Sequence, residues 1–235
     1  MMAPVIVLQH IACETLGVIE GLLVSNNIPF RYVRSYASEP IPKTIAQAPA
    51  LIIMGGPMGV YESGRYPFLK EEMAFIEDAL RARRPVLGVC LGSQLLAAVL
   101  GSRIRKGPQK EIGWHPVTLE DSCKTDRLWS GIQSPFTAFH WHGDIFDLPQ
   151  GAVSLASSAL TKFQAIRYGQ NAYGVLLHME VTPAIIGNMV DNFTDELREA
   201  KVDGAEILRR TTDCLPPLQA IGRLVFQRWA SLVEL

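Results

Sequence analysis

The sequence PVLGVCLGSQ at positions 85–94 decides the fold of this chain. Residues 85–89 have no polar side chain and predict a short buried strand, whereas residues 93–100 predict a helix that ends at Gly101. The G-x-C-x-G turn between them is centred on Cys90. A strand that turns directly into a helix forces its central residue into a strained backbone conformation, and flanking glycines avoid collisions with the neighbouring strand and helix. The pattern therefore predicts a cysteine nucleophile at the tip of the turn.

Cys90 is predicted to lie at the N-terminus of that helix. The partial positive charge there favours thiolate over thiol and would make the cysteine a better nucleophile. The alternative is an ordinary buried cysteine before a core helix, because free cysteine is among the most buried residue types. The flanking glycines favour the nucleophile, which needs a base and an orienting group elsewhere in the chain.

The composition indicates a globular protein without a strong electric field. The 235 residues include 22 basic and 23 acidic side chains, for a net charge of −1, and the mean hydropathy is +0.15. This balance gives no reason to expect a nucleic acid or an anionic membrane as partner. The cysteines are widely spaced and form no C-x-x-C pair: Cys13, Cys90, Cys123 and Cys214.

Without a disulfide framework, a signal peptide or an apolar run of membrane-spanning length, a cytoplasmic location is predicted. No cofactor is predicted, since nothing resembles a phosphate-binding G-x-x-x-x-G-K-[ST] loop.

Apolar strands alternate with helices in the first part of the chain. Strands are predicted at 5–8, 30–33, 51–54 and 85–89, and helices at 14–24, 68–83 and 93–100. Continuous apolar strands that alternate with helices indicate a parallel sheet covered on both faces.

After Gly101 the pattern changes. Strands with only turns between them are predicted at 112–119, 136–141, 152–156, 163–167 and 172–177, which indicates a partly antiparallel addition to the edge of the parallel sheet. A C-terminal helical extension is predicted over about 184–235, with Pro217 in the first turn of an amphipathic helix. The sequence thus predicts one α/β domain over residues 1–235, with an open, mostly parallel sheet and helices on both faces.

His178 and Glu180 are the candidates for the base and its orienting group. They follow an apolar strand in the sequence LLHMEVTP, and residues i and i+2 of an extended chain point the same way. Both side chains can therefore face the site. The carboxylate would fix the tautomer of the imidazole and stabilise the imidazolium that forms when the thiol loses its proton. The alternative is a surface H-x-E pair without a role.

Gly55 and Gly56 follow the third predicted strand, and open parallel sheets bind ligands at the carboxyl ends of their strands. Their backbone N–H groups, with that of Leu91, are predicted to stabilise an oxyanion, because no side chain blocks a substrate carbonyl. The alternative is that Gly-Gly-Pro is only a turn. His10 ends the first strand close to the same edge and is given no role, and the cysteines other than Cys90 are predicted to pack.

The stretch His140-Trp141-His142-Gly143-Asp144 is the other notable cluster. H-x-H followed by Asp is compatible with zinc. No further His, Cys or Glu follows at a familiar ligand spacing, so no metal site is predicted. A metal-dependent hydrolase that uses His140, His142 and Asp144 is the distant alternative.

Five motifs, in this order, resemble those of the class I glutamine amidotransferase family, most closely the amidotransferase part of GMP synthase. They cover about residues 51–183 and are Met54-Gly55-Gly56-Pro57, Gly88-Val89-Cys90-Leu91-Gly92-Ser93-Gln94, Glu111-Ile112-Gly113-Trp114, His142-Gly143-Asp144 and His178-Met179-Glu180-Val181-Thr182. The resemblance implies a flavodoxin-like sheet and a Cys-His-Glu triad.

The resemblance also implies a role for each matching position. Cys90 would attack the side-chain amide of glutamine and form a γ-glutamyl thioester. His178, oriented by Glu180, would take the thiol proton and give it to the leaving ammonia. The backbone N–H groups of Gly56 and Leu91 would hold the oxyanion. The positions implied in binding L-glutamine or a γ-glutamyl compound are Gly55, Gln94, Trp141 and His142.

Two positions depart from the family pattern. Met179 replaces the proline of the family's His-Pro-Glu, and Trp141 replaces the serine of its Ser-His-Gly-Asp segment. The first change should be tolerated, because the two outer side chains do the chemistry. The second bears on the shape of the pocket and hence on the substrate.

The family's ammonia normally passes to a synthase domain, and this chain has no Ser-Gly-Gly signature of an ATP-pyrophosphatase. We therefore expect either a separate synthase subunit that accepts the ammonia or an enzyme that acts alone. Acting alone, it would be a glutaminase or a γ-glutamyl peptidase. A catalytically silent regulatory subunit is a further alternative, although Cys90, His178 and Glu180 are all present.

Overall fold

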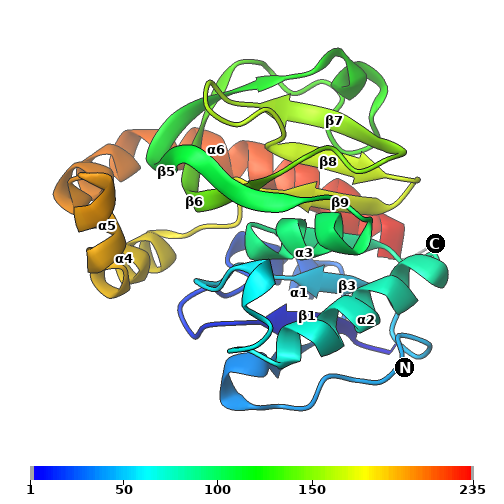
Figure 1. The fold of residues 1–235 in the computed structure, drawn as a ribbon. Helices are drawn as coiled ribbons and strands as arrows, with labels where there is room; N and C mark the ends of the chain where they lie inside the picture. The colour runs from blue at the N-terminus through cyan, green and yellow to red at the C-terminus, as the bar shows by residue number, and fades with distance from the viewer. Residues whose placement is uncertain (1–2, 234–235) are drawn as a thin grey trace.

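A nine-stranded sheet forms the centre of the molecule (Figure 1). The structure, a computed structural model, describes residues 3–233. Parallel strands lie at one end, in the order β2 (Phe30–Arg34), β1 (Val5–Gln9), β3 (Leu51–Ile53), β4 (Val86–Val89) and β9 (Ala172–Val175). Antiparallel strands continue the sheet from β9, in the order β8 (Ala165–Tyr168), β7 (Ala152–Ser157), β5 (Ile104–Leu119) and β6 (Phe136–Phe146).

The predicted α/β fold is confirmed, with its antiparallel addition at the edge of the parallel strands. Four of the eight pairs of neighbouring strands are antiparallel, so this addition makes up more of the sheet than the sequence predicted.

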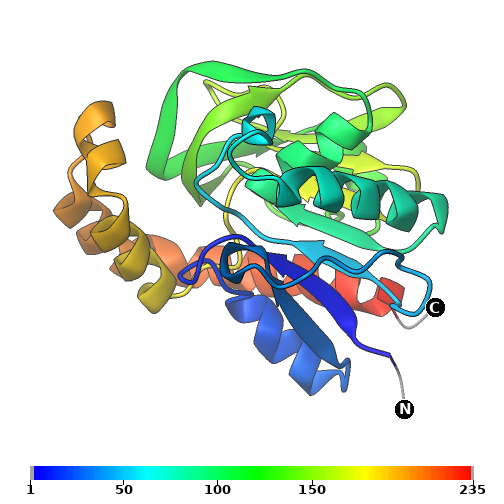
Figure 2. The same cartoon turned by 60° about the horizontal axis from the view of Figure 1, so that its bottom comes forward.

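Helices cover both faces of the sheet (Figures 1 and 2). They are α1 (Val18–Ser25), α2 (Phe68–Arg81), α3 (Leu91–Val99), α4 (Pro183–Asn192), α5 (Thr194–Ala200) and α6 (Gly204–Val233), and short 3₁₀ helices lie at Ser35–Ala37, Val60–Glu62 and Asp121–Thr125.

The two faces of β1 show how the layers form. Val5 and Val7 belong to the apolar core shared with α1 and α6, whereas Ile6 and Leu8 belong to the core shared with α2 and α3. Successive side chains of a strand point to opposite faces, so a strand that is apolar throughout must be covered on both sides.

The boundaries of α1 and α3 differ from the predicted ones, and both differences concern the site. α3 begins at Leu91, immediately after Cys90, rather than at residue 93. α1 begins at Val18 rather than at residue 14, because Gly17 has a φ of 53° that interrupts the helix. A Cβ at Gly17 would collide with the carbonyl oxygen of Glu180, which accepts a hydrogen bond from the amide of Val18 at 2.8 Å.

Two strands are longer than predicted. β5 begins at Ile104 rather than at residue 112, and β6 ends at Phe146 rather than at residue 141. The added residues pair with one another at the edge of the sheet. Residues 104–110 of β5 are mostly polar and lie exposed or half-buried, so the apolar signal is lost there, whereas Ile145 and Phe146 of β6 are buried. By contrast, β9 ends at Val175, so His178 lies beyond the strand that was predicted to reach residue 177.

The prediction for Pro217 was wrong. Pro216 and Pro217 lie in the interior of α6 and not in its first turn. A proline in a helix interior costs about 3 kcal/mol. Burial of one face of α6 compensates for this cost, through Leu215, Leu218, Val225, Phe226 and Trp229. None of the helices in the described part of the chain combines the length and the apolar character needed to cross a membrane.

Candidate active site

Cys90 joins β4 to α3 in a strained backbone conformation. Its φ of 50° and ψ of −110° lie in a region that residues with a Cβ rarely adopt. The Cys90 amide donates to the carbonyl oxygen of Val175 at 2.8 Å. A Cβ at Gly88 would collide with the carbonyl of Gly92, and a Cβ at Gly92 would collide with that of Ile53. The turn therefore has the predicted strand-turn-helix geometry, and its two glycines are required by close backbone approach.

His178 and Glu180 form a buried hydrogen-bonded pair. Nδ1 of His178 lies 2.7 Å from Oε1 of Glu180, and the two residues are 0% and 2% exposed. The His178 amide donates to the carbonyl of Phe139 at 2.8 Å, so β6 fixes this segment after β9 has ended. The other ring nitrogen, Nε2, accepts no hydrogen bond from the described residues.

The charges around His178 favour its protonated form. Burial works to lower the pKa of His178, but the negative charge of Glu180 and that of an ionised Cys90 outweigh burial and raise this pKa well above its ordinary value of 6.5. The surroundings of His178 therefore favour the imidazolium over the neutral ring.

Two opposing influences act on the Cys90 thiol. Burial raises the pKa of Cys90 above its ordinary value of 9.0, although the positive charge of His178 works in the opposite direction.

Gly55 and Gly56 follow β3, the direct neighbour of β4 in the sheet. A Cβ at Gly55 would lie 3.4 Å from Cβ of Cys90, and a Cβ at Gly56 would lie 3.1 Å from a methyl carbon of Leu91. The glycine pair thus lies against the turn that carries the cysteine. Neither the Gly56 amide nor the Leu91 amide donates a hydrogen bond to the described residues, so both are free to bind a ligand.

A cavity of about 330 Å³ opens beside Cys90. The predicted binding positions Gln94, Trp141 and His142 line it together with Gly56, whereas Gly55, Leu91, His178 and Glu180 are not among its lining residues. The Cys90 thiol donates to the backbone carbonyl oxygen of Trp141 at 3.6 Å. The side-chain amide of Gln94 donates to the backbone carbonyl oxygen of Asp144 at 3.1 Å. The lining also contains charged residues that the sequence analysis did not single out: Glu14, Glu62, Lys106, Lys110 and Glu196.

Glu14 is the main residue of the cavity that sequence reasoning missed. It is 5% exposed, and a Cβ at Gly55 would collide with its Oε2. Burial raises the pKa of Glu14 to about 7, and the charge of Glu180 adds to the effect while that of His178 opposes it. The sequence placed Glu14 at the start of a helix. Its position after the first strand, at the same edge as Gly55 and Cys90, was the signal that could have found it.

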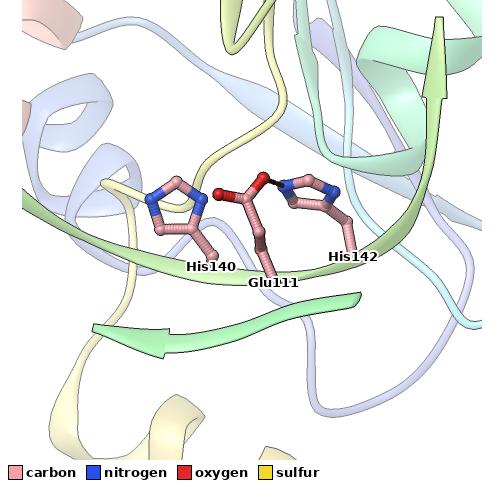
Figure 3. A group of neighbouring side chains, drawn as sticks. All are labelled: Glu111, His140 and His142. Carbon is pink, nitrogen blue, oxygen red and sulfur yellow. Dashed lines mark ion pairs between the residues drawn. The ribbon is translucent and has the colours of Figure 1, made fainter. Parts of the chain in front are cut away.

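Glu111, His140 and His142 offer three buried ligand atoms within 4.8 Å of one another (Figure 3). Asp144, the third member of the cluster considered from sequence, is not part of this group. Nε2 of His142 lies 3.4 Å from Oε2 of Glu111, and the ring nitrogens of His140 have no hydrogen-bond partner among the described residues. Burial lowers the pKa of His142 to about 3 and that of His140 well below 6.5, so both rings are neutral.

The carboxylate of this group is already hydrogen-bonded on both oxygens. Oε1 accepts from Ser158 at 2.6 Å, and Oε2 accepts from Thr161 at 2.5 Å and from Gln164 at 3.0 Å. A zinc ion would require its ligands at about 2.0–2.2 Å. We interpret Glu111 and His142 as members of a polar network that ties β5 and β6 to the loop before β8.

Comparison with known proteins decides the family. The family described as glutamine amidotransferase class-I matches residues 18–196. The chain belongs to the class I glutamine amidotransferase family. It is 32% identical to the glutamine amidotransferase-like protein YfeJ of Salmonella typhimurium over 195 residues, which cover 82% of each chain. It is also 32% identical to a glutamine-hydrolysing GMP synthase of Thermosipho melanesiensis over 151 residues, which cover 63% of this chain but only 27% of that synthase.

Solved structures of class I glutamine amidotransferases have the same fold. The structure of a glutamine amidotransferase from Thermotoga maritima superposes with a TM-score of 0.88 at 31% identity, over 100% of both chains. One from Methylobacillus flagellatus superposes with a TM-score of 0.90 at 30% identity, over 99% of this chain and 96% of the other.

The two departures of this amidotransferase from the family pattern have structural explanations. Met179 is fully buried, and its backbone and Cβ pack against Gly222 of α6, so the middle residue of the His-Met-Glu segment faces the core. Trp141 presents its carbonyl to Cys90, while its indole packs against Phe193 with ring centroids 5.8 Å apart. The Trp141 side chain thus joins β6 to the segment between α4 and α5 at the cavity.

Proposed function

We propose that the chain hydrolyses the side-chain amide of glutamine, or of a closely related γ-glutamyl compound, through a γ-glutamyl thioester on Cys90. The observation that carries this proposal is the buried His178–Glu180 pair: Nδ1 of His178 lies 2.7 Å from Oε1 of Glu180, and Nε2 has no hydrogen-bond partner among the described residues. A nucleophile, a base and a group that orients the base are the parts that such a reaction needs.

In the first half-reaction the Cys90 sulfur attacks the amide carbon and its proton passes to Nε2 of His178. The negative charge that develops on the substrate oxygen is stabilised by the free N–H groups of Gly56 and Leu91. The C–N bond then breaks, and His178 returns the proton to the leaving ammonia. Water, activated by the same ring, hydrolyses the thioester and releases glutamate.

Glu180 has a positioning and electrostatic role in this mechanism. Its Oε1 accepts the Nδ1–H of His178, which leaves Nε2 as the nitrogen that handles the thiol proton. Because the pair is buried, the carboxylate stabilises the imidazolium more strongly than it would in water. The charge on Glu180 is the reason why His178 competes for the proton of a thiol whose own pKa burial raises.

The cavity supports a small amino-acid substrate. Its volume of about 330 Å³ lies at the lower end of the range of roughly 300–1,000 Å³ that is usual for small-molecule sites. Both acidic and basic side chains line it, which suits the α-ammonium and α-carboxylate groups of a glutamyl compound. The name of the glutamine-hydrolysing GMP synthase supports glutamine as the amide donor. On this proposal a separate synthase subunit accepts the ammonia; a γ-glutamyl peptidase that acts alone is the second form of the same chemistry.

Glutamate release from L-glutamine and, separately, from a γ-glutamyl dipeptide tests the proposal. Cys90→Ser is expected to lower the rate by at least about 10³-fold, because it removes the nucleophile. Cys214→Ser, at a half-buried cysteine of α6, is the matched control and should leave the rate unchanged. Release from the dipeptide alone would identify a peptidase. A wild-type chain that releases glutamate from neither and forms no covalent adduct on Cys90 with a glutamine-like chloroketone would overturn the proposal.

A further inference from the structure

A buried histidine outside the proposed triad touches the loop of Gly55 and Gly56. His10 follows β1, is 1% exposed and is not among the residues that line the cavity. Its Nδ1 lies 3.0 Å from the carbonyl oxygen of Gly55, and its Nε2 lies 2.8 Å from Oε2 of Glu72 on α2. The hydroxyl of Ser35 donates to the other oxygen of Glu72 at 2.5 Å. These buried contacts connect three elements of the fold to the proposed oxyanion loop.

The partners of His10 determine its protonation state. The Gly55 carbonyl can only accept a hydrogen bond, and an ionised Glu72 can only accept as well, so both ring nitrogens must carry a proton. The ring is then an imidazolium paired with a buried carboxylate. The pKa of His10 agrees with this assignment: burial works to lower it, but the charges of Glu72 and Glu14 and the hydrogen bonds to Glu72 and Gly55 raise it above 6.5.

The geometry of a peptide bond transmits this contact to the proposed oxyanion hole. In a planar trans peptide the carbonyl of one residue and the N–H of the next point in opposite directions. Anchoring the Gly55 carbonyl to His10 therefore turns the N–H of Gly56 away from His10. Gly56 lines the cavity together with Cys90, and its N–H has no hydrogen-bond partner among the described residues.

We propose that His10 is a positioning residue of the oxyanion hole: it donates from Nδ1 to the Gly55 carbonyl and so keeps the Gly56 N–H directed into the cavity. Glu72 and Ser35 hold the ring in place from the opposite side. This assignment rests on the proposed function, in which Gly56 binds the oxyanion. His10 itself contacts no reacting atom.

Two substitutions separate positioning from packing. In His10→Asn the side-chain amide can occupy the place of Nδ1 and still donate to Gly55, whereas in His10→Gln it occupies the place of Nε2 and keeps only the contact with Glu72. Both variants lose the ring but keep the Cβ of His10, the atom that lies 2.6 Å from a Cβ built at Gly56. A role in packing alone predicts the same activity for both.

The measured quantities are kcat and KM for glutamate release, and the rate at which iodoacetamide alkylates Cys90. Loss of one oxyanion donor costs about 10²–10³-fold in kcat. We therefore expect His10→Gln to lower kcat by about 10-fold or more with little change in KM, and His10→Asn to retain most of kcat. Alkylation needs the nucleophile but no oxyanion hole, so its rate should stay within about two-fold of wild type in both variants.

Equal kcat values in the two variants, or a fall in alkylation that parallels the fall in kcat, would overturn the assignment. A different result would refute the proposed function itself: a wild-type chain that releases no glutamate and forms no covalent adduct on Cys90. The ¹⁵N chemical shifts of the His10 ring in the wild-type protein test the same arrangement without any variant. A proton on Nδ1 at pH 7 is expected, and a ring whose Nδ1 carries no proton would contradict the donor assignment.

Discussion

Replacing Glu14 by glutamine should make the folded protein more stable relative to wild type as the pH rises. Glu14 is 5% exposed, and burial raises the pKa of its carboxyl group from 4.5 to about 7, with the charges of Glu180 and Glu196 adding to burial and those of His178 and His10 opposing it. Below pH 4.5 the group is protonated in both folded and unfolded chains and costs nothing. Between pH 4.5 and 7 the unfolded chain loses this proton first, so stability falls until the pH exceeds the folded-state pKa.

The size of the effect follows from the shift. A change of about 2.5 pKa units corresponds to about 3 kcal/mol, at 1.36 kcal/mol for each unit. Glutamine has a similar shape but does not titrate, so the variant escapes this penalty. Any change in hydrogen bonding that the new amide introduces is independent of pH, and the slope of the difference against pH is therefore the diagnostic quantity.

Urea unfolding of wild type and Glu14→Gln at a series of pH values from 4.5 to 8.5 measures this slope. The difference in the free energy of unfolding should grow in favour of the variant by about 3 kcal/mol across the series. Glu71→Gln, at an exposed carboxylate on α2, is the matched control and should show no such growth. A constant difference between Glu14→Gln and wild type would refute the reasoning, because it would mean that Glu14 ionises equally easily in both states.

Further predictions concern the base and the packing of the fold. Glu180→Gln should lower kcat by about 10²–10⁴-fold, since it removes the charge that favours protonated His178; steady-state kinetics would show it. Gly92→Ala should strongly destabilise the folded protein, because the added Cβ would collide with a backbone carbonyl. The Cβ of Gly187→Ala on α4 would meet nothing within 4 Å, so this variant should raise the free energy of unfolding in urea by about 0.5–1 kcal/mol. Trp229→Ala, at a fully buried side chain of α6, should cost about 3–5 kcal/mol in the same assay.

Local patterns predicted much of the fold. The strands β1, β3 and β4 were predicted correctly because a strand buried on both faces is an uninterrupted run of apolar residues. The G-x-C-x-G turn was recognised because it directly follows such a run. The first half of β5 was missed because its residues are mostly polar and pair at the sheet edge with the end of β6. The continuation of α6 through Pro216 and Pro217 was missed because proline has a low helix propensity. Burial of the apolar face of α6 in the folded protein outweighs that propensity.

In the candidate site, too, local sequence patterns predicted some residues, whereas the contacts of others depend on the tertiary fold. Cys90, His178 and Glu180 were proposed from short motifs whose spacing carries the geometry, and the structure brings His178 and Glu180 together at 2.7 Å. The contacts of His10 reach across 45 residues to Gly55 and 62 residues to Glu72. No local spacing encodes such contacts. They follow only from the strand order, which places the ends of β1, β3 and β4 side by side.

This strand order also explains why Gly55 and Gly56 have no room for a side chain. A side chain at Gly55 would occupy the place of the Glu14 carboxylate, and one at Gly56 would meet His10 and Leu91. The loop after β3 is thus enclosed by the loop after β1 and by the Cys90 turn, as well as kept clear for a substrate. In the proposed mechanism such enclosure would lower the reorganisation needed when the oxyanion forms, because the backbone that carries the N–H groups is held in place. On that mechanism the residues that surround the glycines would contribute to catalysis by fixing the backbone, although motifs around the nucleophile do not include them.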